Sequence, residues 1–101
     1  PTVLVVAFDK NDVYTYPGGK HSSGIEDAAI VATHLHLAAC NEGVDSCWIN
    51  NFDPDALAAD LGLPENEQIL MLLDLGYAAE GAGPLPNHSS RKPLEETVKY
   101  I

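Results

Sequence analysis

The fold of this chain is decided by the stretch Gly43-Val44-Asp45-Ser46-Cys47-Trp48-Ile49-Asn50-Asn51-Phe52-Asp53-Pro54. Its first half is a short apolar run that predicts a buried strand over residues 44–49, which stops at two asparagines. Asp53 is a preferred helix N-cap and Pro54 suits the first helical position, so the second half opens a short helix that Gly62 ends. A strand, a polar turn and a capped helix in succession are a common way of presenting backbone N–H groups to a ligand.

Two further apolar runs predict the remaining strands of the domain. Residues 2–8 and 69–75 are rich in Val, Leu and Ile without strict alternation. Runs of this kind are typical of strands that are covered on both faces. The order strand, helix, strand, helix, strand predicts a single domain over residues 1–101, of the α/β or α+β layered class.

A long helix is predicted between the first two strands. Ser23 and Glu26 match a capping box, and Gly43 supplies the left-handed residue that ends a helix after about Glu42. Its apolar residues surround most of its circumference, so we expect a long buried helix, covered on more than one side by something that this chain does not supply alone. These residues are Ile25, Ala28, Ala29, Ile30, Val31, Ala32, Leu35, Leu37, Ala38, Ala39 and Cys40.

The connecting segments are polar and rich in turn residues. Residues 9–22 and 78–90 contain most of the Gly, Pro and Asn outside the predicted elements and are expected to be irregular. Residues 93–101 predict a helical turn that passes into a terminal strand.

Composition limits the partners and the compartment. The chain has 101 residues and a net charge of −10, from 15 acidic and 5 basic residues. This balance argues against nucleic acid and against an anionic membrane surface. The sequence shows neither a membrane span nor a signal peptide, so we expect a cytoplasmic protein. Cys40 and Cys47 are too few for a disulfide framework and are predicted to be reduced thiols in the core.

Most candidate chemical motifs fail on spacing. Gly19-Lys20 lacks the preceding glycine and the following hydroxyl residue of a phosphate-binding loop. His34 and His36 point in different directions from one helix, so they cannot share a metal ion. No catalytic and no metal-binding residue is therefore predicted. The Asn50-Asn51 turn remains, and the residues alone leave open whether it contacts a ligand or simply ends a strand.

These segments, taken in order, resemble the C-terminal half of the FMN-dependent nitroreductase family. The resemblance includes the strand at the start, the Ala- and Leu-rich helix, the short strand that ends before Phe52-Asp53, and the closing Arg91-Lys92-Pro93-Leu94. Leu61-Gly62-Leu63-Pro64 and Leu75-Gly76-Tyr77 also match. The resemblance implies an oxidoreductase that takes a hydride from NAD(P)H onto FMN and passes electrons to a nitroaromatic or quinone-type acceptor.

The same resemblance implies the cofactor contacts. Residues just before Phe-Asp in this family donate backbone N–H groups to the N5 and O4 edge of the flavin, and here they are Ile49, Asn50 and Asn51, with Trp48 one step back. Many members have an acidic residue followed by glycine at this turn, so the two asparagines put any role of a carboxylate in doubt. Arg91 matches the basic residue that reaches the FMN phosphate, although by itself it reads as an exposed charge on a loop.

The family's Arg-Ser-x-Arg phosphate-binding segment and the helices of its dimer core have no counterpart in this sequence. We therefore expect a fragment or a half-domain, completed as a homodimer or by a complementary N-terminal half. The alternative is a non-catalytic, truncated module that binds flavin weakly or only serves as an assembly surface.

Overall fold

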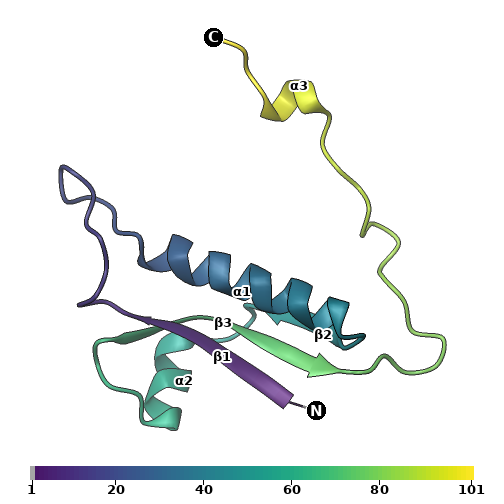
Figure 1. Cartoon of the computed structure of the whole chain (residues 1–101), viewed down its shortest axis with the longest axis horizontal. Coiled ribbons are helices and arrows are strands. Elements are labelled where there is room, and N and C mark those ends of the chain that lie inside the picture. The colour runs from purple at the N-terminus through teal and green to yellow at the C-terminus, as the bar shows by residue number, and fades with distance from the viewer. Residues whose placement is uncertain (1) are drawn as a thin grey trace.

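The computed structural model describes residues 2–101, so Pro1 lies outside the described residues. Strands and helices follow one another in the predicted order (Figure 1). They are β1 (Thr2–Asp9), α1 (Gly24–Asn41), β2 (Asp45–Ile49), α2 (Pro54–Leu61), β3 (Glu67–Gly76) and α3 (Leu94–Thr97).

The three strands form one antiparallel sheet in the order β1-β3-β2. The last strand in the sequence thus lies in the centre, where Met71 is opposite Val6 of β1 and Leu73 is opposite Trp48 of β2. Because β1 and β2 both run antiparallel to β3, they are parallel to each other, and α1 connects them across the sheet. The layered α+β class predicted from the sequence is confirmed.

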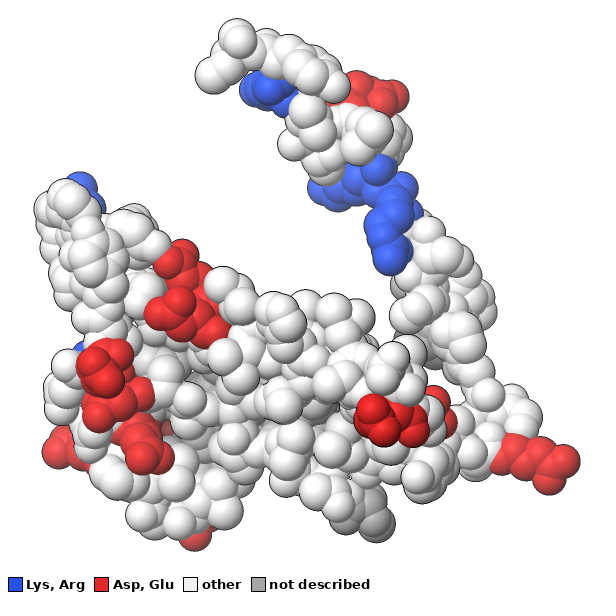
Figure 2. Space-filling model, in the orientation of Figure 1, with Lys and Arg blue, Asp and Glu red and all other residues white. Residues whose placement is uncertain are grey.

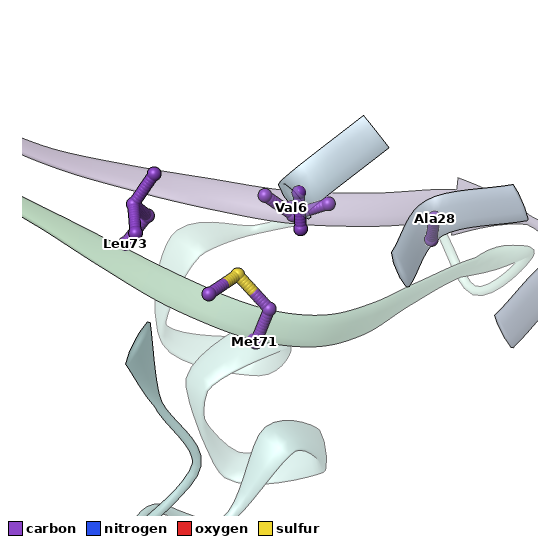
Figure 3. Close-up of a cluster of buried hydrophobic side chains, with 5 residues drawn as sticks. Val6, Ala28, Met71 and Leu73 are labelled. Carbon is purple, nitrogen blue, oxygen red and sulfur yellow. The ribbon is translucent and has the colours of Figure 1, made fainter. Parts of the chain in front are cut away.

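The core lies between α1 and the sheet. It consists of Val6, Ala28, Ala32, Met71 and Leu73, of which Figure 3 labels four. Ala32, Met71 and Leu73 are fully buried. The small alanines let the axis of α1 approach the sheet closely, so that Met71 and Leu73 fill the space beneath it.

Only one side of α1 is covered by the described residues. The outer side exposes large apolar residues, with Ile25 57 % and Leu37 61 % accessible to solvent. Val3 and Val5 of β1 are also exposed, so within this chain β1 is not covered on both faces as its apolar run predicts. The strand β2, predicted to be buried, is half exposed because it is an edge strand. These runs therefore contain more apolar residues than this chain buries.

The start of α1 differs from the predicted capping box. The Ser23 side chain makes no cap hydrogen bond; its hydroxyl oxygen accepts instead from the backbone N–H of Tyr14, with a donor to acceptor distance of 3.2 Å. The Glu26 carboxylate accepts from the Tyr16 hydroxyl rather than from the N-cap backbone, and this contact raises the pKa of Tyr16. The predicted box is wrong because the loop before α1 folds back beside the helix and supplies other partners.

The start of α2 agrees with its sequence signals. The Asp53 carboxylate accepts from the backbone N–H groups of Asp55 and Ala56 at 3.0 and 3.2 Å, and Gly62 ends the helix with φ +67°. This helix packs against β3 and makes no contact with α1. In Figure 1, α1 lies above the sheet and α2 below it.

Residues 77–101 form an extended tail that is exposed throughout (Figure 1). The helical turn α3 is present as predicted, but the expected terminal strand is absent from the described residues: Val98 is extended and has no strand partner. The radius of gyration is 16.9 Å, compared with about 13 Å for a compact domain of this length. The tail therefore adds nothing to the core described above.

Both cysteines are exposed free thiols. The prediction that they are reduced agrees with this, whereas their predicted position in the core is wrong. Cys40 is exposed near the end of α1, and Cys47 is exposed on the edge strand β2.

Candidate flavin-binding turn

The candidate site is the turn that follows β2. Ile49 is the last residue of β2 that pairs with β3, opposite Leu72. Asn50 and Asn51 then leave the sheet as exposed residues, before Asp53 caps α2. The turn is therefore fixed by a strand on one side and a capped helix on the other.

Two backbone donors are free at this turn. Within residues 2–101, the N–H groups of Asn50 and Asn51 donate to no other protein group, while Ile49 belongs to the β2–β3 ladder. Adjacent unpaired donors suit a ligand edge that carries hydrogen-bond acceptors, as the N5 and O4 edge of a flavin does. The turn thus fits the group that the sequence implies, with Asn50 and Asn51 as the donors and Ile49 as a neighbouring side chain.

Trp48 is joined to this turn by its side chain. The indole N–H of Trp48 donates to the side-chain oxygen of Asn50 at 3.1 Å. Trp48 is 37 % exposed to solvent, so it is not buried in the core. This bond joins Trp48, near the end of β2, to Asn50, the first residue after the strand.

Two further contacts hold β2 in place, and neither is signalled by the sequence. The Ser46 hydroxyl is hydrogen bonded to Nδ1 of His36 on α1 at 3.1 Å. The Asp45 carboxylate accepts from the backbone N–H of Ala78 at 2.7 Å, where the tail leaves the sheet. These residues are far apart in the sequence, and no local pattern predicts such pairs.

Arg91 lies apart from the other predicted cofactor residues. It is exposed in the tail, where one of its guanidinium nitrogens donates to the backbone carbonyls of His88 and Ser90 at 2.9 and 2.7 Å. Figure 2 shows the tail, which carries both blue basic and red acidic side chains, extending away from the rest of the molecule. The structure thus brings Trp48, Ile49, Asn50 and Asn51 together and leaves Arg91 outside this group.

The larger hollows of the surface lie elsewhere. One of about 390 Å³ lies between α2 and the start of β3, lined by residues that include Lys10, Pro54 and Ile69. None of the five predicted cofactor residues lines it. The turn after β2 is instead an open surface. A ligand bound there stays partly exposed unless other protein covers it.

Residues 2–101 contain neither a metal-ligand cluster nor a membrane-spanning helix. No three His, Cys, Asp or Glu side chains gather where they could hold a metal ion. No helix of this part of the chain is both long and apolar enough to cross a membrane. The cytoplasmic location expected from the sequence stays a prediction.

Comparison with known proteins identifies the family. The model of the nitroreductase family matches residues 1–77, which include all three strands of the sheet and the helices α1 and α2. The chain belongs to the nitroreductase family. The turn after β2 and the cap of α2 lie inside the matched region, whereas Arg91 lies beyond it.

Individual relatives agree with this assignment. A nitroreductase family protein from Clostridium difficile 630 has a similar structure, with a TM-score of 0.83 and 31 % identity over 97 % of this chain and 58 % of its own. A candidate nitroreductase from Exiguobacterium sibiricum 255-15, solved in complex with FMN, gives a TM-score of 0.65 and 26 % identity over 78 % of this chain and 36 % of its own.

Among curated proteins, the candidate NAD(P)H nitroreductase MhqN of Bacillus subtilis (strain 168) is 28 % identical over 83 residues. The match covers 81 % of this chain and 39 % of the relative. This nitroreductase family chain therefore spans less than two thirds of the length of each of these relatives.

Proposed function

We propose that this chain provides the flavin-edge half of an FMN-dependent oxidoreductase, which takes a hydride from NADH or NADPH and passes electrons to a nitroaromatic or quinone-type acceptor. Membership of the nitroreductase family and the FMN complex of a structural neighbour support a flavin cofactor. The name of the Bacillus relative supports NAD(P)H as the reductant. The observation that carries the proposal is the pair of unpaired backbone donors at Asn50 and Asn51.

The residues of the chain act by holding these donors in place. Pairing of Ile49 with Leu72 fixes the turn on one side, and the Asp53 cap of α2 fixes it on the other. Donors that are held before the ligand arrives need no reorganisation when negative charge develops on the acceptor atoms that they face. FMN, when bound, supplies the hydride and electron transfer itself, so no catalytic side chain is required of the protein.

The site requires additional protein around it. The outer side of α1 and the outer residues of β1 are apolar and exposed, and the tail is not packed on the body. We propose that a second copy or a complementary N-terminal half covers these surfaces and brings phosphate-binding groups to the flavin, together with Arg91. Sedimentation velocity at low micromolar concentration is then expected to show a species larger than the monomer; a single folded monomer would contradict the homodimer.

The binding test follows Trp48, which is the only tryptophan of the chain. FMN is titrated into the ¹⁵N-labelled chain, and the indole N–H resonance is followed up to about 1 mM ligand, a range that detects binding as weak as about 4 kcal/mol. We expect saturable shifts with a dissociation constant above about 1 µM. Absence of any shift would refute the flavin site, and sub-micromolar binding would refute the half-domain.

A further inference from the structure

The contact between Trp48 and Asn50 fixes the orientation of the Asn50 amide. An indole N–H is a donor and never an acceptor, so the Asn50 atom 3.1 Å from it must be the carbonyl oxygen. The amide nitrogen therefore lies on the other side of the group and does not face the indole nitrogen. Its two N–H groups have no partner within residues 2–101.

The segment of the chain that contains this amide is uncharged. Residues 48–52 contain no ionisable side chain, although the chain carries 15 acidic residues. The nearest carboxylate along the chain, Asp53, is occupied by two backbone N–H groups of α2. Negative charge that develops on a ligand beside Asn50 is therefore met by neutral donors and not by a nearby free carboxylate of this segment.

We propose that Asn50 determines acceptor specificity at this turn, and that its amide N–H groups, oriented by Trp48, donate to an oxygen of a nitro group or a quinone carbonyl. This proposal rests on the proposed function and assigns Asn50 a role separate from that of its backbone N–H. The side chain moves no proton. It binds an acceptor oxygen, and the hydrogen bond strengthens as that oxygen gains negative charge.

The physical consequence is a preference among electron acceptors. An acceptor with a suitably placed oxygen satisfies the Asn50 donors, whereas one that takes electrons without binding at the turn gains nothing from them. Ferricyanide, which accepts single electrons without a hydrogen bond from the protein, is the reference acceptor, and menadione is the quinone probe. Trp48 acts as a positioning residue, because without its indole N–H the Asn50 amide is free to rotate.

The first test examines the anchor without any turnover. In ¹H–¹⁵N spectra of the chain, Asn50→Ala is expected to shift the single indole N–H resonance to that of a solvent-exposed indole. Asn50→Asp keeps an oxygen that accepts from Trp48, and it is expected to leave the resonance hydrogen bonded. Added 4-nitrobenzyl alcohol is expected to shift the Asn50 side-chain NH₂ pair. Unchanged indole resonance in Asn50→Ala, or an unmoved NH₂ pair, would overturn the inference.

The second test compares the two acceptors with NADH and excess FMN. Asn50→Ala is expected to lower kcat/KM for menadione about tenfold, the value of one hydrogen bond, and to lower that for ferricyanide by a clearly smaller factor. Asn50→Asp is expected to lose at least as much with menadione, and Trp48→Phe about threefold. Asn41→Ala, which removes an exposed asparagine at the end of α1, is the matched control and is expected to leave both rates unchanged.

The outcomes separate the two proposals. Equal losses for menadione and ferricyanide in Asn50→Ala would overturn the specificity role and leave the proposed function standing. An FMN-loaded assembly of this chain with its second copy or complementary half that reduces neither acceptor would overturn the proposed function, and the specificity role with it.

Discussion

Substitution of Gly24 by alanine tests the packing of α1 on the sheet. Gly24 is the first residue of α1 and is buried against Phe8 of β1. A Cβ atom built on Gly24 overlaps Cε2 and Cδ2 of the Phe8 ring and lies 3.0 Å from Cζ. The atoms that it meets belong to an aromatic ring that packs against the core, so relief requires the ring or the helix to move.

Whether Gly24→Ala raises or lowers the free energy of unfolding shows which dominates, the helix propensity of residue 24 or its packing against Phe8. Helix propensity by itself predicts that Gly24→Ala stabilises the chain by up to about 1 kcal/mol. Overpacking of a formed core costs about 1–3 kcal/mol. Since the overlap involves two ring atoms, the steric effect exceeds the propensity gain, and we expect a net loss of about 1–2 kcal/mol in the free energy of unfolding.

Urea unfolding followed by far-UV circular dichroism, at one fixed protein concentration, measures this loss. Gly76→Ala is the matched control, because a Cβ there meets nothing within 4 Å and the residue needs no positive φ. Its stability is expected to stay within about 0.5 kcal/mol of the original chain. In a Phe8→Leu background the cost of Gly24→Ala is expected to shrink. A stabilising Gly24→Ala, or the same cost in both backgrounds, would refute the packing argument.

Three further outcomes are expected. Asp53→Ala removes the acceptor of two backbone N–H groups at α2 and should lower the unfolding free energy by about 1 kcal/mol in the same assay, whereas no change would contradict the cap. In the flavin-loaded protein, Asn51→Pro removes a backbone donor and should slow flavin reduction by NADH about a hundredfold in stopped flow; Asn51→Ala keeps that donor and should be much milder, so equal effects would implicate the side chain instead. Hydrogen bonds from the Asn66 side chain and the Asn11 backbone hold the pKa of Asp9 below its usual 3.8. A folded-state pKa below the unfolded value adds stability that is present above about pH 4 and lost as the pH falls through the folded value; an NMR titration that places the Asp9 pKa at or above 3.8 would contradict this.

The candidate site was predictable from the sequence only in part. The end of the strand at Ile49, the asparagine turn and the Asp53 cap all follow from local signals, and the structure contains each of them. The flavin as the ligand of this turn was predicted only from the family resemblance. The side-chain bond between Trp48 and Asn50 was not foreseen, because no local pattern says which side-chain atoms meet where a strand ends.

Contacts between distant parts of the chain were not predictable. The bond of His36 to Ser46 joins α1 to β2, and the bond of Asp45 to Ala78 joins β2 to the tail. Each depends on how α1 crosses the sheet and on where β3 leaves it. The position of Arg91 relative to the turn was not predictable either, because it depends on a tail that the described residues do not hold against the body.

The sequence by itself determined the elements and most of their ends. A helix ends at Gly43 or Gly62, and begins after Asp53, because backbone conformation and nearby hydrogen bonds involve only a few neighbouring residues. Tertiary structure alone decided that β3 lies between β1 and β2, that Ser23 pairs with Tyr14, and that the cysteines are exposed. These outcomes depend on free energies shared between residues far apart in the chain, and on which surfaces remain uncovered once the small core of Val6, Ala28, Ala32, Met71 and Leu73 has formed.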